Sequence, residues 1–445
     1  MSDQRGSSNI SRNWLDISLK ECISKIKSGL SRRILEQDIG IPVITSGNLQ
    51  DGKFDASHLR YWYAKDPQGA TIDDYVLDDG DILLNFINSV EQMGKVCIFK
   101  NIGRPCIYTT NLFRIKSSNL TTQDFLYFLL SSQNIQQQIK SITKPAINQA
   151  SFTTGDLLRL EVKLPPFYEQ QKVIEPLKAI DRAIATTESL IEKYQKIKAG
   201  LMHDLFTRGI GADGKLRPLR DQAPELYQES TIGWIPKDWE FKAFQYGLNA
   251  SPKNGYSPKE VDTWQGVYVL GLGCLTKNGF IPIQLKKAPR NSLQSGARLE
   301  EGDFLISRSN TQELVGLCGI YRDIGHDAIY PDLMMRLKLN QNLSAEFLEQ
   351  YLLSPAVRQR ISAIAVGTSG SMVKINSKTI KFLKIIYPDF CEQIKIVEQL
   401  QPVIKQLDCL CTQLEKLKKQ KSGLMHDLLT GKVSVKISPD EATYE

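Results

Sequence analysis

The chain has 445 residues, more than one ordinary hydrophobic core holds, which predicts two domains with connecting elements. Its 56 Lys and Arg against 49 Asp and Glu give a formal charge of +7, which permits a polyanionic partner without requiring one. The sequence has no C-x-x-C pair, no apolar leader and no run of 18 apolar residues, so we expect no zinc site, no disulfide framework, no membrane contact and a cytoplasmic location.

Residues 1–168 are predicted to form the first globular domain. It contains short β-rich runs broken by Gly, Asp and Asn, such as YVLDDGDILLNF, KVCIFK and CIYTTNLFRI. A helical stretch from Phe125 to Ser141 follows them. This pattern predicts a mixed α+β domain with a curved sheet.

Residues 169–207 are predicted to form a long helix with a coiled-coil heptad pattern. Its seam includes Leu177, Ile184, Ile191 and Lys198. Pro176 is expected to kink the helix or to delay its start. Residues 208–237, rich in Gly, Pro and charge, are interpreted as a linker.

The second half repeats this order. Residues 238–391 form the second predicted domain, with runs VYVLGLG, GDFLISR and AIYPDLMMRLKL and a helical stretch from Ala345 to Ala365. Residues 392–431 form the second predicted helix, with a proline at position 402, and 432–445 form a tail. The seam of this helix includes Leu400, Leu407, Leu414 and Lys421.

The two halves are copies of one unit. The helices align without a gap at an offset of 223, and the block from Gly200 to Leu205 recurs from Gly423 to Leu428. Each half also opens on a tryptophan, Trp14 and Trp239. Weaker matches at an offset of 222 join Leu77–Leu83 to Leu299–Leu305, Gly94 to Gly316, Tyr108 to Tyr330, Arg114 to Arg336 and Phe125 to Phe347.

The two helices are predicted to pair with each other. A parallel pair would place Lys198 opposite Lys421 as like charges in a desolvated seam, so an antiparallel coiled coil is favoured. The fold class is therefore two α+β domains, each followed by a repeated helix, with pseudo-twofold symmetry. The alternative is that each helix packs only on the core of its own domain.

The sequence contains no recognisable catalytic or cofactor-binding motif. The tetrapeptide from Leu164 to Phe167 resembles an amino-methyltransferase loop, but Leu164 cannot accept the hydrogen bond that this chemistry needs. The dipeptides His203-Asp204 and His426-Asp427 are interpreted as residues that cap or pack the C-terminal ends of the helices. Cys409 and Cys411 are expected to be buried rather than to bind a metal.

Taken together, the sequence resembles the specificity subunit of type I restriction-modification systems. The resemblance rests on the helix entries LPPFYEQQKVI and YPDFCEQIKIV, on the exits GLMHDLFTRGI and GLMHDLLTGKV, and on GWIPKDWEF, which opens the second domain. It covers nearly the whole chain. The turn YPDFC departs from the usual Pro-Pro turn of the family.

The resemblance implies a subunit that recognises DNA and has no catalytic activity. Each domain would read one half of a bipartite target as a target recognition domain, and the paired helices would dock two methyltransferase subunits. Those partners would bring S-adenosylmethionine for DNA methylation at adenine N6. Restriction subunits would add ATP and Mg²⁺ for cleavage in phage defence, and this chain itself would bind no cofactor.

Residues for DNA binding are predicted from their chemistry. Polar side chains on loops beside the sheets are candidates for base contacts: Asn48, Asn88, Ser89, Gln92, Arg308, Asn310, Thr311 and Gln312. Basic side chains are candidates for phosphate contacts: Lys25, Arg32, Arg33, Lys144, Lys253, Lys259 and Lys374. Ordinary polar surface loops are the alternative interpretation.

A scaffold protein is the competing hypothesis from another class. Its coiled coil would assemble partners, and its globular domains would bind protein rather than double-stranded DNA. Binding to DNA that weakens steeply with salt separates the two hypotheses.

Overall fold

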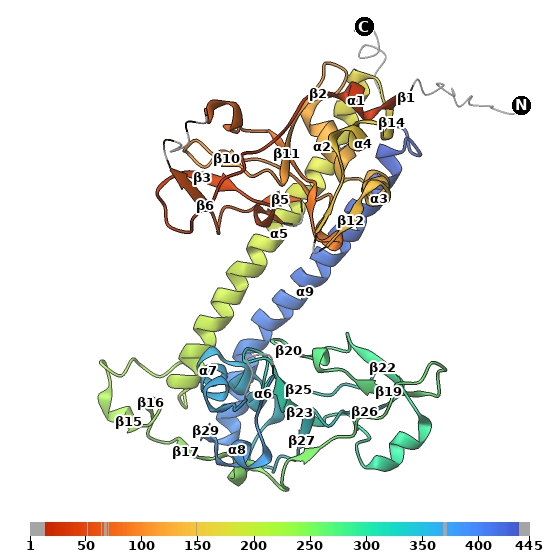
Figure 1. The fold of residues 1–445 in the computed structure, drawn as a ribbon. Helices are drawn as coiled ribbons and strands as arrows, with labels where there is room; N and C mark the ends of the chain where they lie inside the picture. Colours follow the sequence, from red (N-terminus) through yellow and green to blue (C-terminus); the bar gives the residue numbers. More distant parts are fainter. Residues whose placement is uncertain are drawn as a thin grey trace, which may run out of the picture. The chain divides into compact units, whose positions relative to one another are not determined.

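The structure is a computed structural model that describes residues 14–50, 52–63, 65, 69, 71–147, 149–367 and 372–435 (Figure 1). The chain forms two compact units. The first joins residues up to 188 with those from 413 onward, and the second is the continuous stretch 189–412. The start of the first predicted domain, before residue 14, and the tail after residue 435 lie outside the described residues.

The main sheet of the first unit separates two hydrophobic cores. Its antiparallel strands run in the order β2 (Ile23–Ser28), β11 (Leu112–Ser117), β7 (Ile82–Asn85) and β9 (Val96–Ile98). Alternate side chains of a strand point to opposite faces. Ile82 and Leu84 enter one core and Leu83 enters the other, and all three are fully buried. The run is apolar throughout because both faces of β7 are covered.

Two short helices cover one face of this sheet, α2 (Gln123–Ser131) and α3 (Gln133–Ile142). The helical stretch predicted from Phe125 to Ser141 is confirmed, and it is divided into two helices. Ser132 has extended backbone angles, and its hydroxyl accepts a hydrogen bond from the backbone N–H of Ile135 at 3.4 Å. A serine in this role caps the start of a new helix, so the chain bends there.

The smaller elements of the first unit surround the main sheet. Strand β10 (Ile107–Tyr108) pairs with β3 (Gly40–Ile44) in parallel, and the other pairings are antiparallel. The remaining elements are α1 (Leu19–Cys22), α4 (Thr154–Leu158), η1 (Ser46–Asn48), η2 (Asp73–Tyr75) and η3 (Val90–Gln92), with β6 (Arg60–Tyr63) on β3, β1 (Leu15–Ser18) on β14 (Glu161–Leu164), β4 (Leu49–Gln50) on β5 (Lys53–Phe54), and the sheet β12 (Lys144–Ala146), β13 (Gln149–Ser151), β8 (Ile87–Asn88).

The second unit has the same topology. Its main sheet runs β18 (Lys253–Asn254), β27 (Met334–Leu337), β23 (Phe304–Ser307) and β25 (Cys318–Ile320), covered by α6 (Ala345–Leu353) and α7 (Pro355–Ile364). The helical stretch predicted from Ala345 to Ala365 is also confirmed and divided into two helices, because Ser354 and Pro355 start a new one.

Most of the other elements of the second unit have a counterpart in the first. They are β19 (Val267–Leu270) between β22 (Leu285–Ala288) and β26 (Asp327–Ile329), β17 (Glu240–Ala243) on β29 (Lys384–Tyr387), β20 (Leu275–Thr276) on β21 (Gly279–Phe280), β24 (Ser309–Asn310) on β28 (Val373–Lys374), α8 (Ser377–Phe382), η5 (Phe244–Gly247), η6 (Leu272–Cys274) and η7 (Arg290–Ser295). The mixed α+β class predicted for both domains is thus correct.

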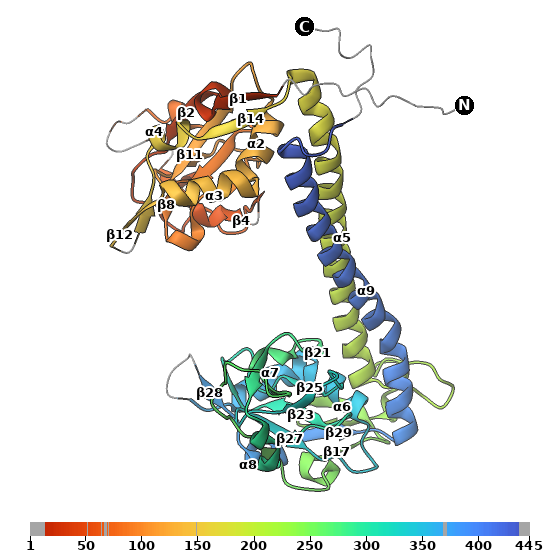
Figure 2. The same cartoon turned by 90° about the vertical axis from the view of Figure 1, so that its right-hand side faces the viewer.

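The long helices are α5 (Phe167–Thr207) and α9 (Phe390–Leu429). Pro176 and Pro402 lie inside them, so of the two expected effects, a kink or a delayed start, the delayed start is excluded. Each unit contains a half of α5 beside a half of α9 (Figures 1 and 2). The end of α9 joins the core of the first unit through Leu428 and Leu429, and the end of α5 joins the core of the second unit.

Burial along the predicted seam is graded. Of the seam residues named above, the two nearest the start of each helix are buried, and the two that follow are half-buried. The buried members are Leu177, Ile184, Leu400 and Leu407, and the half-buried members are Ile191, Lys198, Leu414 and Lys421.

The segment interpreted as a linker, 208–237, is folded. It contains η4 (Pro224–Leu226) and the hairpin of β15 (Tyr227–Ser230) and β16 (Gly233–Pro236). Ile210 and Ile235 join the core of the second unit. High Gly, Pro and charge content predicted a linker, but two buried isoleucines anchor the segment to its domain.

The cysteines divide into two groups. Cys22, Cys97, Cys106, Cys274 and Cys318 are buried, and Cys391, Cys409 and Cys411 are exposed. The expectation that Cys409 and Cys411 are buried was wrong, because both are at exposed positions of α9. Burial raises the pKa of the Cys22 thiol to about 11 and that of the Cys97 thiol to about 12.

Thiol labelling should follow this division, because the thiolate is the reactive form. With N-ethylmaleimide at pH 7.5, we expect the folded chain to react quickly at the three exposed cysteines and the unfolded chain to react at all eight. Peptide mass spectrometry locates the labels. Rapid labelling of Cys22 or Cys97 in the folded chain would contradict the burial described here.

Candidate nucleic-acid interface

Two predicted base-contacting asparagines occupy equivalent places in the two domains. Asn88 ends β8, which pairs with β13, and Asn310 ends β24, which pairs with β28. The side-chain oxygen of Asn88 accepts from the backbone N–H of Ser89 at 2.8 Å, and that of Asn310 accepts from Thr311 at 2.9 Å. Among the described residues, neither amide NH₂ has a hydrogen-bond acceptor, so each side chain keeps two donors for a base edge.

The same small sheets bring two predicted phosphate contacts close to these asparagines. Lys144 lies on β12, which pairs with β13 beside Asn88. Lys374 lies on β28, and its Cα is opposite Ser309, next to Asn310. Both lysines are exposed. Each domain thus combines an amide donor and a cation on one short sheet, the combination that a base and its neighbouring phosphate need.

The other predicted base contacts differ in availability. Ser89, Gln92 and Thr311 are exposed. Gln312 is exposed too, but it donates to the backbone carbonyl and hydroxyl of Ser362, so it fastens its loop to α7. Arg308 is half-buried and donates to the carbonyl of Asp332 at 3.3 Å. Gln312 and Arg308 would have to break these bonds to reach a base.

Asn48 was predicted to contact a base, but its side chain faces the interior of its domain. Its side chain is buried, its oxygen accepts from the backbone N–H of Thr45 at 2.9 Å, and its NH₂ donates to the carbonyls of Asp55 and His58. This asparagine closes its own turn. A buried amide whose bonds are satisfied loses free energy if it turns outward, so we remove Asn48 from the candidate base contacts.

The remaining predicted phosphate contacts lie on other strands and loops. Arg32 is half-buried, and its guanidinium donates to the carbonyl of Ser31 at 2.8 Å. Four are exposed, and no contact within the described ranges links them to Asn88 or Asn310: Lys25, Arg33, Lys253 and Lys259.

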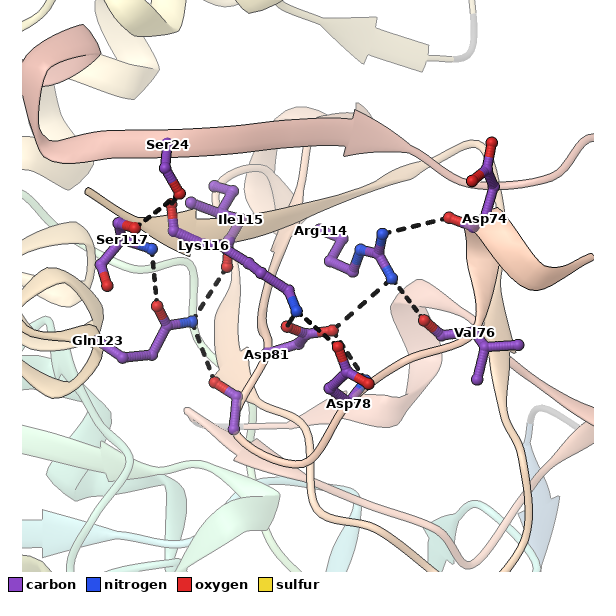
Figure 3. A network of polar contacts seen from close by, with 11 residues as sticks. Ser24, Asp74, Val76, Asp78, Asp81, Arg114, Ile115, Lys116, Ser117 and Gln123 are labelled. Atoms are coloured by element: carbon purple, nitrogen blue, oxygen red, sulfur yellow. Dashed lines mark hydrogen bonds and ion pairs between the residues drawn. The ribbon is translucent and has the colours of Figure 1, made fainter. Parts of the chain in front are cut away.

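A buried polar network supports the loop that carries Asn88 (Figure 3). The Arg114 guanidinium, on β11, donates to the carbonyls of Val76 and Asp74 and lies 3.9 Å from the Asp81 carboxylate. Asp81 in turn accepts from the backbone N–H of Asp78 at 2.9 Å. Burial raises the pKa of Asp81. The network fixes the start of β7, and the candidate loop follows that strand.

The second domain repeats this network with its own residues. Arg336 lies 2.9 Å from the Asp303 carboxylate, which accepts from the backbone N–H of Glu300 at 3.0 Å. Each arginine also lies over a tyrosine ring, at 5.9 Å for Tyr108 and 5.4 Å for Tyr330. The matched pairs Arg114 with Arg336 and Tyr108 with Tyr330 therefore belong to the buried frame of each domain.

A second repeated contact, a hydrogen bond between a tryptophan and a glutamate, joins each long helix to its domain. Glu169 accepts from the indole N–H of Trp14 at 3.2 Å, and Glu392 accepts from that of Trp239 at 2.9 Å. Each of these tryptophans opens its domain, so each carboxylate ties the start of the domain to the helix that follows it.

The residue after each glutamate is a fully buried glutamine. The oxygen of Gln170 accepts from the backbone N–H of Thr122, and that of Gln393 accepts from Ser344, both at 2.9 Å. Thr122 and Ser344 are the N-caps of α2 and α6. The amide groups donate to the carbonyls of Leu120 and Pro165 in the first unit and of Asn342 and Pro388 in the second.

These glutamate and glutamine pairs were not predicted as structural residues. They lie near the start of each long helix, where neighbouring polar residues are normally expected to face solvent. Their identity in both copies, at an offset of 223, was the available signal.

Within the described residues, no helix is both long and apolar enough to cross a membrane. Across the same part of the chain, no three His, Cys, Asp or Glu side chains are grouped so as to hold a metal ion.

Comparison with known proteins assigns the family. A model of the type I restriction modification DNA specificity domain matches residues 12–196 and 252–419. The chain belongs to this family. A DNA specificity subunit recognises DNA sequence, is not itself an enzyme, and assembles with other restriction-modification subunits.

Individual relatives agree over most of the chain. A Methanocaldococcus jannaschii protein named as the specificity subunit of the MjaX type I restriction enzyme is 28% identical, over 96% of this chain and 95% of the relative. The EcoKI specificity subunit of Escherichia coli is 22% identical, over 88% and 82%. The fold resembles a type I S subunit from M. genitalium, with a TM-score of 0.54 at 15% identity over 95% of this chain and 98% of that one.

Replacing a buried glutamine should destabilise its unit. In Gln393→Leu, the Ser344 N–H and the carbonyls of Asn342 and Pro388 would be left buried without a partner, at about 1–3 kcal/mol each. We expect a clear fall in the thermal unfolding midpoint of the full chain. The matched control is Gln413→Leu, at an exposed position of α9. Equal midpoints for the two variants would show that the buried hydrogen bonds do not support the fold.

Proposed function

We propose that this chain reads a bipartite DNA target, with one half-site for each globular domain. The observation that carries the proposal is the equivalent placement of Asn88 and Asn310, each with two free amide donors, on small sheets that also present Lys144 or Lys374. The two domains share a topology and a buried frame, yet their exposed side chains differ. Two different half-sites would require this combination.

We further propose that α5 and α9 form an antiparallel coiled coil that spaces the two domains. Two ion pairs in the first unit support it: Lys421 Nζ lies 2.7 Å from Asp181, and Lys418 Nζ lies 3.9 Å from Glu188. As residue numbers rise along α5, those of their partners fall along α9. In the second unit, burial lowers the pKa of Lys198, and the carboxylates of Glu349 and Asp408 oppose that shift.

Two methyltransferase subunits are the proposed occupants of the repeated block GLMHDL. Gly200 and Gly423 lie within helices, where glycine costs about 1 kcal/mol relative to alanine. Both are exposed, and a Cβ atom at either would meet no described atom within 4 Å. The fold of this chain thus gives no reason for either glycine, whereas close approach of a partner would.

Equivalent clefts follow these glycines and support the same proposal. In the first unit, Met425 and His426 line a cleft of about 480 Å³ against Ser132. In the second, Met202 and His203 line one of about 550 Å³. Two matching surfaces on one chain suit two copies of one partner. The partners would supply S-adenosylmethionine chemistry, and restriction subunits would supply ATP- and Mg²⁺-dependent cleavage.

Single asparagine variants should affect one half-site each. The probe is a duplex with the bipartite motif found by methylation sequencing of cells that co-express the chain with its methyltransferase. We expect Asn88→Ala to weaken binding about tenfold, since a good bidentate contact contributes about 1–3 kcal/mol. In this variant, base changes in one half-site should lower the affinity less than they do in the unmodified chain. Asn310→Ala should have the same effect on base changes in the other half-site. Loss at both half-sites in either variant would contradict independent reading.

The proposed function itself is tested on the unmodified complex. We expect its affinity for this duplex to fall steeply between 50 and 200 mM salt, as for a protein that neutralises several phosphates. A complex that assembles but binds the duplex no better than an unrelated sequence would support the scaffold hypothesis instead.

Adding one methyl group to each glycine tests the docking surfaces. Gly423→Ala should stabilise its helix slightly but weaken one methyltransferase contact about tenfold, as expected for overpacking of about 1–3 kcal/mol. By analytical ultracentrifugation at a concentration near the dissociation constant of the unmodified chain, each single variant should lose most of its binding at one site, and the double variant with Gly200→Ala should lose most of it at both. Thr186→Ala, at an exposed position of α5, is the control. Two bound methyltransferases in the double variant would exclude this surface.

A further inference from the structure

The two clefts proposed to dock the methyltransferases share an apolar floor. Met202 and Phe206 of α5 line the cleft of the second unit, and Met425 and Leu429 of α9 line that of the first, at an offset of 223. Each of these side chains is buried or half-buried. Two copies of one partner present the same group to both clefts, so the group that fits both floors is expected to be apolar.

One wall of each cleft is the start of a helix, and this wall differs between the units. Gln133 and Asn134 begin α3 in the first unit, and Pro355 and Ala356 begin α7 in the second. The positions are equivalent because each pair follows the serine N-cap of its helix, and all four residues are exposed. The first wall therefore presents two amides, where the second presents two side chains without a polar atom.

The rims of the clefts also differ. In the first unit, the rim includes the exposed and charged residues Asp16, Glu161 and Lys163, with Lys163 Nζ 4.0 Å from the Asp16 carboxylate. In the second, the turn of the β15–β16 hairpin contributes Thr231 and Ile232. Ile232 is 37% exposed, although short hairpin turns favour Gly, Asn and Asp. At this place it extends the apolar surface of the cleft.

We infer that the two clefts bind the same methyltransferase with unequal affinity and that the cleft of the second unit fills first. This inference rests on the proposed docking of two methyltransferases and adds an order of assembly to it. An apolar group that enters the second cleft removes water from apolar surface on the floor, the wall and the rim. In the first cleft, the same group removes water from the amides of Gln133 and Asn134 without offering a hydrogen bond, which costs free energy.

The test measures the two binding steps separately. Native mass spectrometry counts the chains with no, one and two methyltransferases as the methyltransferase is added to the full-length chain. We expect the first step to be about tenfold tighter than the second, beyond the statistical factor for two equal sites, as one unsatisfied amide would produce. Gly200→Ala, in the second unit, should weaken the first step. Gly423→Ala, in the first unit, should weaken only the second step.

Exchange of one residue between the two walls identifies the cause. Ala356→Asn gives the second cleft the residue of the first and should weaken the first step about tenfold, whereas Asn134→Ala should strengthen the second step. Each new residue already occupies the equivalent helix position in the other unit, so both variants should fold. Ile232→Ser should also weaken the first step. The control is Ala250→Asn, at an exposed position of the second unit that does not line the cleft, and it should bind as the unmodified chain does.

The outcomes distinguish this inference from the docking proposal. Equal intrinsic affinities in the two steps would overturn the inference and leave the docking proposal standing. An unchanged first step in both Ala356→Asn and Ile232→Ser would do the same, and so would a weakened first step in Gly423→Ala, which would show that the charged rim binds the partner more strongly. Two bound methyltransferases in the double variant of Gly200→Ala and Gly423→Ala would instead overturn the docking proposal, and the inference with it.

Discussion

A buried glutamine at the start of each long helix is the contact on which the arrangement of each domain depends. Gln170 and Gln393 are fully buried, and each uses both its side-chain oxygen and its NH₂ group in hydrogen bonds. A buried polar group without a hydrogen-bond partner would lower the free energy of unfolding. Each holds the N-cap of the helix pair and the turn that precedes its own helix. The adjacent glutamate binds the opening tryptophan. The start, the middle and the exit of each domain therefore meet at one point on a rigid helix.

This frame explains why a duplicated chain can tolerate divergent surfaces. The network of Asp81 and Arg114, repeated by Asp303 and Arg336, is buried within the sheet and holds the strand before the candidate loop. Side chains beyond that strand face solvent and contribute little to the core. They can change while the loop keeps its position, so a new sequence preference need not compromise stability.

The sequence predicted the features that depend on periodicity and repetition, and missed those that depend on tertiary packing. Heptads located both long helices to within two residues. The prediction of Asn48 as a base contact failed, because a turn asparagine that is buried has the same local sequence as one that is exposed. Ser132 and Ser354 divide each predicted helical stretch into two helices, since a serine cap competes with an otherwise continuous apolar pattern. Cys409 and Cys411 are exposed, because burial on a long helix depends on which of its faces other segments cover, and periodicity alone does not show this.

The division of the long helices between the units has a consequence for synthesis of the protein. The second unit is one continuous stretch, 189–412, and its core can close as soon as that stretch has been made. The first unit takes Leu428 and Leu429 into its core. Those residues leave the ribosome after the whole second unit, so the domain that is translated first is the one that is completed last.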